Sequence, residues 1–263
     1  MFDFSGQVVA ITGAARGIGL ATARAFARAG AHVALMDRDG PAVHEAARTL
    51  RAEFKDVSQR IEGLELDVTQ PVSVRSGVDA VARWHDRLDV MINNAGTALR
   101  RPTLELTLEE WNQVMEVNLT GVFLCAQAAG RHMVTARRGC IINTASIMGL
   151  SGGGLYPNIS YQSTKGAVVN LTRALAVEWA PHQVRVNAVA PTWVRTDFIQ
   201  PLLEAPVKEP LRCPKSSLSS NSLGMAAVLM ATKGPSARGE CLCKARATNS
   251  LPEPDSPVIN TVT

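Results

Sequence analysis

A glycine-rich segment, Thr12-Gly-Ala-Ala-Arg-Gly-Ile-Gly19, constrains the fold of this chain more than any other part of its sequence. It follows a β-branched run at residues 7–12 and precedes apolar residues spaced as on the buried face of a helix. Glycines in a strand-to-helix turn let the backbone approach a ligand, and the free N–H groups at the helix start attract an anion. The segment therefore predicts a βα unit whose turn binds the phosphates of a dinucleotide, through Gly13, Arg16, Gly17, Ile18 and Gly19.

Strand-like runs and helix-period segments alternate along the next 170 or so residues. We expect further strands at residues 32–36, 61–66, 89–92, 140–145 and 184–189. Helices are expected at residues 17–29, 41–54, from about 70 to 82, 108–137 and 160–180. This alternation predicts a Rossmann-like α/β fold in a single domain, with a doubly wound parallel sheet covered by helices on both faces.

The composition argues against several classes of protein. The net charge is +4, but the basic residues are scattered, so we expect no nucleic-acid partner. No apolar run approaches the ~20 residues of a membrane helix, and the N-terminal residues lack a signal peptide's basic region. Five cysteines without framework spacing favour a reducing, cytoplasmic location, and neither they nor the five histidines form a metal motif.

The second strand ends on Asp37, 18 residues after Gly19. A carboxylate at this place accepts hydrogen bonds from both hydroxyls of an adenosine ribose and repels a 2′-phosphate, which favours NAD as cofactor. Arg38 and Arg16 instead favour NADP, because either guanidinium can pair with its 2′-phosphate. NADP therefore remains the alternative cofactor.

Tyr161 and Lys165 stand at i and i+4 of one expected helix, so both side chains reach the same face. A phenol is a poor base near neutral pH, and we expect the lysine and a positive nicotinamide ring to depress the pKa of Tyr161. Tyr161 then exchanges a proton with an alcohol or ketone as a hydride moves. Ser146, at a strand end fifteen residues earlier, is expected to hold the substrate oxygen.

Together these motifs resemble the classical short-chain dehydrogenase/reductase family over about residues 5–200. The matching segments are Thr12-Gly13-x-x-x-Gly17-Ile18-Gly19, Asp67-Val68, Asn93-Asn94-Ala95-Gly96, Asn118, Ser146, Tyr161-x-x-x-Lys165 and Pro191…Thr196. The resemblance implies an NAD(P)-dependent enzyme that acts on a small alcohol or carbonyl compound. It also implies a homo-oligomer.

The family pattern adds roles that the residues alone do not show. It implies that Asn118 kinks the long helix and anchors a water for proton relay to Lys165, which also holds the nicotinamide ribose. It implies that Asp67 and Val68 line the adenine pocket and that Asn94 and Ala95 line the adenosine side. Thr196 is implied to contact the carboxamide. The remaining cofactor-binding positions are Gly96, Pro191, Thr192 and Val194.

Two segments depart from this pattern. The family has Pro-Gly where this chain has Pro191-Thr192, and nothing after Pro201 resembles its last helix and seventh strand. Eight of the 14 prolines but only three of the 20 glycines fall in the last 63 residues. We therefore expect residues 1–200 to be the dinucleotide-binding and catalytic domain, and residues 201–263 to be an atypical, poorly ordered tail. The seventh strand is expected to be missing or replaced, and residues 223–231 allow a short helix.

The leading hypothesis for function is an NAD(P)-dependent oxidoreductase that transfers a hydride between nicotinamide and a secondary alcohol or ketone. The spacing from Ser146 to Tyr161, with glycines between them, resembles members that oxidise sugars or polyols. One alternative is an NADPH-dependent carbonyl reductase of the 3-oxoacyl type. Another, prompted by the unusual tail, is a dinucleotide-binding pseudoenzyme without turnover.

Overall fold

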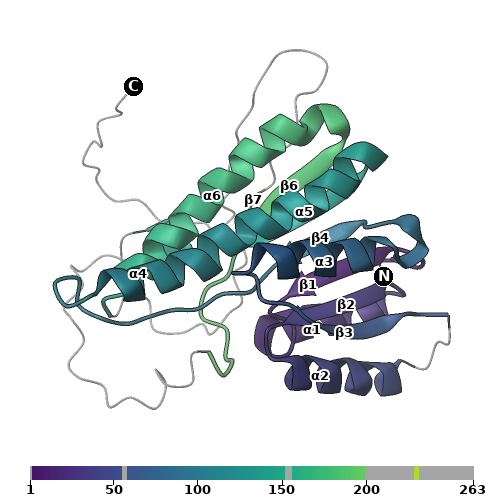
Figure 1. Ribbon diagram of the computed structural model, residues 1–263, viewed down its shortest axis with the longest axis horizontal. Helices are drawn as coiled ribbons and strands as arrows, with labels where there is room; N and C mark the ends of the chain where they lie inside the picture. Colours follow the sequence, from purple (N-terminus) through teal and green to yellow (C-terminus); the bar gives the residue numbers. More distant parts are fainter. Residues whose placement is uncertain (1, 55–57, 152–155, 199–227, 231–263) are drawn as a thin grey trace, which may run out of the picture.

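The computed structural model describes residues 2–54, 58–151, 156–198 and 228–230. Six parallel strands form one sheet in the order β3-β2-β1-β4-β5-β6, and an antiparallel β7 pairs with β6 (Figure 1). The strands are β1 (Val8–Thr12), β2 (His32–Asp37), β3 (Ile61–Glu65), β4 (Val90–Asn93), β5 (Gly139–Thr144), β6 (Val184–Ala190) and β7 (Val228–Met230). The predicted Rossmann-like fold is confirmed, and the strand order reverses between β1 and β4, where such sheets bind ligands.

Helices cover both faces of this sheet (Figure 1). On one face lie α1 (Gly17–Arg28) and α2 (Gly40–Glu53), and on the other lie α3 (Pro71–Ala82), α5 (Gly121–Ala136) and α6 (Ile159–Trp179). Shorter helical segments are η1 (Trp84–Asp86), α4 (Leu108–Met115), η2 (Glu116–Thr120), η3 (Ile147–Gly149) and η4 (Ala180–His182). The boundaries of β1 to β6 and of α1, α2, α3 and α6 fall within one or two residues of the predicted ones, whereas η1, η3 and η4 were not predicted.

Alternate side chains of the central strand β1 enter two separate cores. Val8 and Ala10 pack with residues of α3, α5 and α6, whereas Val9 and Ile11 pack with residues of α1 and α2. All four are fully buried. This is the two-residue period of a strand covered on both sides, and it explains why the run is apolar throughout.

The predicted single helix at residues 108–137 is wrong in its interior. Thr107 and Glu110 form a capping box that starts α4, with hydrogen bonds of 3.2 and 3.1 Å between each side chain and the other's backbone N–H. Residues 116–120 then form a π-helical turn, η2, before α5 continues to Ala136. A π turn inserts one extra residue and shifts the helix face, and it contains Asn118, where the family resemblance implied a kink.

The secondary structure after β6 differs from the short helix that the sequence analysis allowed at residues 223–231. Residues 228–230, inside the segment expected to permit a helix, form the antiparallel strand β7 at the edge of the sheet beside β6. β7 pairs only with Ala188–Ala190, so in the described part of the chain Val184–Asn187 have a partner strand on the β5 side alone. The rest of the predicted tail, residues 201–227 and 231–263, and the glycines at 152–154 lie outside the described residues.

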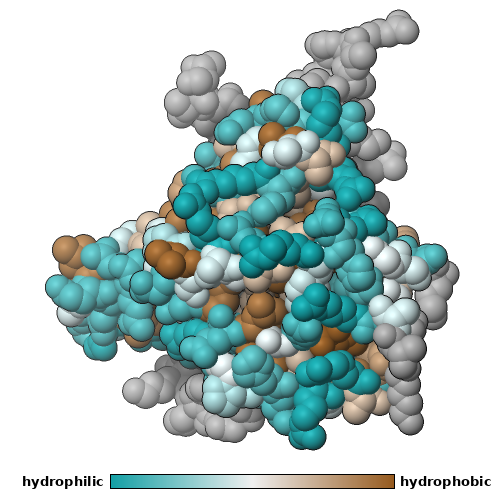
Figure 2. Space-filling view, turned by 45° about the vertical axis from the view of Figure 1, so that its right-hand side comes forward, coloured by the Kyte–Doolittle hydropathy of each residue, from teal (hydrophilic) through white to brown (hydrophobic). Residues whose placement is uncertain are grey.

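On the face shown in Figure 2, hydrophilic residues predominate and hydrophobic ones appear between them. The most exposed large apolar side chains, such as Val72, Leu104 and Val177, come from separate elements. Among the described residues, no helix is long and apolar enough to cross a membrane.

Candidate active site

The carboxyl ends of the parallel strands open into one cleft of about 1210 Å³. Nearly all the predicted site residues line it, although they are spread over some 180 positions of sequence. These are Gly13, Arg16, Gly17, Ile18, Asp37, Arg38, Asp67, Val68, Asn94, Ala95, Gly96, Ser146, Tyr161, Lys165, Pro191, Thr192, Val194 and Thr196. The structure thus brings the phosphate turn and the Ser146–Tyr161–Lys165 group into a single hollow.

Gly19 and Asn118 are the two predicted site residues that do not line this cleft. Gly19 is buried in the first turn of α1, and a Cβ there would collide with the carbonyl oxygen of Gly13. The absence of a side chain at Gly19 therefore lets the helix pack closely against the turn. Gly19 does not line the cleft where a cofactor would bind.

The glycine turn has the geometry that a phosphate requires. Gly13 and Gly17 have φ angles of +64° and +59°, which residues with a side chain rarely adopt. The N-cap of α1, Arg16, makes no side-chain capping bond, so the first N–H groups of the helix lack a side-chain acceptor. A Cβ on Gly17 would meet Thr196 at 3.5 Å, which places the turn opposite the loop after β6. These residues fit a dinucleotide phosphate.

Asn94 and Thr12 hold the turn in place. The Asn94 amide donates to the backbone oxygens of Thr12 and Gly13 at 3.1 and 3.0 Å. In return, the Thr12 hydroxyl accepts from the N–H groups of Asn94 and Ala95 at 3.0 and 3.1 Å. Asn94 therefore ties the end of β4 to the end of β1, in addition to lining the cleft.

Asp37 faces the same turn from the end of β2. Its carboxylate accepts from the N–H groups of Ala15 and Asp39 at 3.1 and 3.2 Å. In the described part of the chain it forms no ion pair with Arg16 or Arg38, which line the cleft beside it. Because a carboxylate offers about four acceptor positions, Asp37 retains capacity for the two hydroxyls of a ribose.

Tyr161 and Lys165 lie on α6 with their side chains close together, and the Lys165 Nζ is 5.6 Å from the tyrosine ring centre. Lys165 Nζ donates to the Thr144 carbonyl at 2.6 Å, and burial lowers the pKa of the amine to about 8. Burial raises the pKa of Tyr161, a hydrogen bond with Ser146 opposes the rise, and the neighbouring Tyr156 adds to it. The expected depression of this pKa is therefore absent from the protein alone, since burial outweighs the hydrogen bond with Ser146.

Asn118 lies behind this group and is completely buried. Its Oδ1 accepts from the Thr97 N–H at 2.8 Å, and its Nδ2 donates to the Thr97 carbonyl at 2.8 Å and to the Thr164 hydroxyl at 3.2 Å. Thr164 directly precedes Lys165 on α6. Asn118 thus joins the π turn, the loop after β4 and the catalytic helix.

Several cleft residues carried no signal that sequence reasoning used. Tyr156, Trp193 and Phe198 line the cleft around Tyr161, and Phe198 has its ring centre 6.3 Å from that of Tyr161. They come from loops, where aromatic residues follow no period. The one sequence signal that could have indicated these three residues is that each is an aromatic residue in a loop after a strand.

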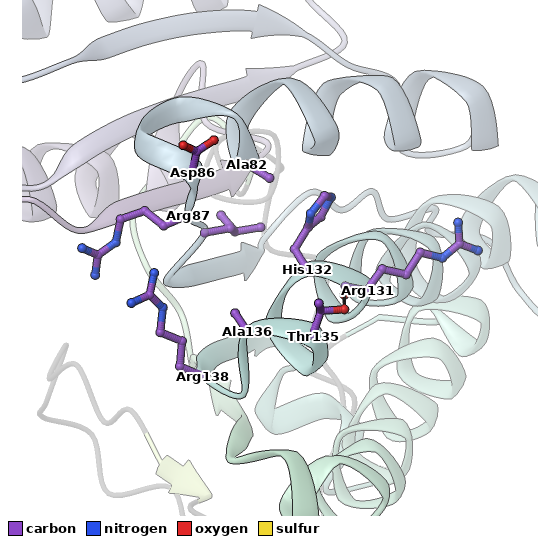
Figure 3. A pocket seen from close by; sticks show the side chains of 9 residues that line it. Ala82, Asp86, Arg87, Arg131, His132, Thr135, Ala136 and Arg138 are labelled. Carbon is purple, nitrogen blue, oxygen red and sulfur yellow. Dashed lines mark hydrogen bonds between the residues drawn. The ribbon is translucent and has the colours of Figure 1, made fainter.

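A second pocket, of about 270 Å³, lies at the opposite ends of the strands (Figure 3). The segment after α3 and the end of α5 face each other across it, and several basic side chains stand at its rim. Arg87 already makes two hydrogen bonds of 2.7 Å with Asp89, and His132 binds Asp79 at 2.7 Å. Since Arg87 and His132 have acidic partners and two helix C-termini point here, the pocket is a poor anion site.

Comparison with known proteins agrees with this geometry. The family described as short chain dehydrogenase matches residues 7–206. Gluconate 5-dehydrogenase of Gluconobacter oxydans is 37% identical over 204 residues, which cover 77% of each chain. D-threitol dehydrogenase of Mycolicibacterium smegmatis is 38% identical over 199 residues, or 75% of this chain and 74% of the relative.

A solved short-chain type dehydrogenase/reductase from Mycobacterium marinum is 41% identical, with a TM-score of 0.73. It matches 77% of this chain, and 78% of its own length is covered. Family and fold therefore agree with the cleft and its Tyr161–Lys165 pair: the chain belongs to the short-chain dehydrogenase/reductase family and is an NAD(P)-dependent alcohol oxidoreductase.

Proposed function

We infer that this protein oxidises a secondary hydroxyl of a polyol- or sugar-like substrate, with NAD as the preferred cofactor. The observation that carries this proposal is the placement of Ser146, Tyr161 and Lys165 in the same cleft as the glycine turn. Relatives named for gluconate and threitol support the substrate class.

In the proposed reaction Tyr161 is the acid–base. The glycine turn and Asp37 would hold NAD in the cleft, where it would supply the acceptor for a hydride from the carbinol carbon. Ser146, which shares a hydrogen bond with Tyr161, positions the substrate hydroxyl beside the acid–base. Tyr161 takes the hydroxyl proton, and a positive charge close by favours its phenolate form. Burial of this group excludes water and strengthens that electrostatic effect.

Lys165 and Asn118 support Tyr161 in this scheme. Lys165 is anchored on the Thr144 carbonyl, so its amine is fixed between the end of β5 and the tyrosine ring. With a pKa lowered to about 8, this amine can release a proton close to neutral pH. Asn118 holds Thr164 and the loop at Thr97, which keeps α6 and Lys165 in place.

The preference for NAD rests on Asp37. Its carboxylate lies beside the turn and forms no ion pair with any of the described residues, so it repels a 2′-phosphate. Arg16 and Arg38 line the same part of the cleft and favour the alternative, an NADPH-dependent carbonyl reductase.

A fluorescence titration of the purified chain with NADH and with NADPH tests the cofactor, and reduction of NAD by a panel of polyols then tests the reaction. We expect saturable binding that favours NADH, with turnover lowered by about 10²–10⁴-fold in Tyr161→Phe. Tighter binding of NADPH would contradict the assignment of Asp37. Binding of either cofactor without turnover would instead support the pseudoenzyme alternative.

A further inference from the structure

Three side chains from three different loops pack together beside the reactive end of the cleft, and we call this group the wall; Tyr156 and Trp193 line the cleft, whereas Arg100 is not among its lining residues. Arg100 follows β4, Tyr156 precedes α6, and Trp193 follows β6. The rings of Tyr156 and Trp193 meet edge to face, with centres 6.1 Å apart at 70°. The Arg100 guanidinium lies over the Tyr156 ring, 4.8 Å from its centre.

This wall stands next to the proposed acid–base. Tyr156 and Trp193 both line the cleft that contains Tyr161. Tyr156 also interacts electrostatically with Tyr161, because it contributes to the raised pKa of that phenol. Tyr156 therefore lies close to the position that a substrate hydroxyl at Tyr161 would take.

Arg100 brings a positive charge that the described part of the protein leaves without an acidic partner. Its Nε is buried without a hydrogen-bond partner, and none of the ion pairs among the described residues includes it. The next residue provides a contrast, since Arg101 pairs with Glu110 at 2.6 Å. The contact with the Tyr156 ring offsets only part of the free-energy cost of removing the half-buried guanidinium from water. A guanidinium in such surroundings is suited to an oxyanion, which it binds through two parallel hydrogen bonds.

The acidic residues of the cleft do not supply this oxyanion. Asp37 and Asp67 lie at the ends of β2 and β3 and accept hydrogen bonds from the local backbone. Glu116 and Asp197 also line the cleft, but neither forms an ion pair with Arg100. Among the described residues the Arg100 guanidinium is thus left without an acidic partner, and it lies over the ring of the cleft-lining Tyr156.

We propose that Arg100, Tyr156 and Trp193 form a subsite for a terminal oxyanion of the substrate, either a carboxylate or a phosphate. The carbon chain lies along the two rings, and the oxyanion meets the guanidinium while a secondary hydroxyl sits at Tyr161. The subsite selects polyhydroxy acids or sugar phosphates over neutral polyols. The inference rests on the proposed alcohol oxidation and names the substrate class of the same site.

Isothermal titration of the NADH complex tests the subsite, because an alcohol binds to this complex without reacting. D-gluconate, D-glucitol 6-phosphate and D-glucitol share a polyhydroxylated six-carbon chain and differ in their terminal group. We expect one of the two anions to bind roughly tenfold to a hundredfold more tightly than D-glucitol, the range for a hydrogen bond to a charged group. Which anion binds more tightly decides between carboxylate and phosphate.

Variants assign the preference to Arg100. Arg100→Gln removes the charge and is expected to bring the anion and D-glucitol within about threefold of each other. Arg100→Lys keeps the charge without the planar fork and is expected to retain part of the preference. Arg101→Gln, which removes the charge of the adjacent, paired arginine, is the matched control and should leave the preference intact. NADH affinity and thermal unfolding of each variant show that it is folded.

Three results would overturn the subsite. They are the absence of an anion preference in the unsubstituted protein, a preference that survives Arg100→Gln, and an equal loss of affinity for all three compounds. The last result would make Arg100 a positioning residue that acts through Tyr156. If the anion preference behaves as expected but none of the compounds reduces NAD, the subsite stands and the proposed oxidation is what fails.

Discussion

Replacing Asn118 by alanine removes a buried junction that three parts of the site share. The side chain makes three hydrogen bonds, two with the backbone of Thr97 and one with the Thr164 hydroxyl. Asn118 is completely buried, so water does not reach its position freely. In Asn118→Ala the N–H and the carbonyl of Thr97 lose these partners together.

The size of the effect follows from these contacts. A hydrogen bond contributes about 1 kcal/mol to stability, so three bonds give a loss of about 3 kcal/mol. In a domain of this size a loss of 1 kcal/mol lowers the melting temperature by about 2–4 °C, which predicts a fall of about 6–12 °C. Since Thr164 adjoins Lys165, we also expect turnover to fall even where the variant is folded.

Thermal unfolding followed by circular dichroism measures the change in stability. Asn112→Ala is the matched control, because Asn112 is exposed on α4 of the same helical segment and its replacement should change stability by at most about 0.5 kcal/mol. A melting temperature for Asn118→Ala within 2 °C or so of the control would show that the junction does not stabilise the fold. A stable variant with full activity would refute the reasoning altogether.

Three further predictions concern the cleft. Tyr161→Phe should lower turnover by about 10²–10⁴-fold, as loss of an acid–base does, while NADH still binds in a fluorescence titration; unchanged turnover would exclude Tyr161 as the acid–base. Asp37→Asn should weaken the preference for NADH over NADPH in the same titration by about tenfold, and an unchanged ratio would contradict its proposed role. Lys165 has its pKa lowered from 10.5 to about 8, so between these pH values only the unfolded chain holds the proton and stability rises with pH. Lys165→Met should lack this rise when melting temperatures are compared from pH 7.5 to 10, and parallel curves for the two proteins would show that the amine is not perturbed.

The sequence was sufficient for the fold because each strand and helix carries its own local signal. A strand buried on both faces is apolar throughout, as in β1, and a helix shows its buried stripe, as in α1. Proline near the first turn marks the starts of α2 and α3, and the predicted boundaries there are accurate. Such signals lie within one segment and need no knowledge of tertiary contacts.

The interior of the long helix could not be predicted in the same way. Residues 108–137 keep a helical pattern throughout, and a π turn changes the hydrogen-bond partner without breaking that pattern. What identifies the turn is the bonding of Asn118 to Thr97 and Thr164, 21 and 46 residues away in sequence. The same limitation applies to Tyr161, whose pKa depends on how deeply the folded protein buries it.

The wall formed by Arg100, Tyr156 and Trp193 could not be predicted from the sequence. Arg100, Tyr156 and Trp193 are separated by intervals that no helix or strand period connects, and each belongs to a loop. The β-strands bring these loops together because β4, β5 and β6 are parallel neighbours whose carboxyl ends meet at one edge. The scaffold therefore fixes where the hydride and the proton move, and it can be recognised from motifs. The proposed selection among alcohols rests on loop side chains, which only the folded chain brings together, and it depends most on Arg100, whose Nε has no hydrogen-bond partner among the described residues.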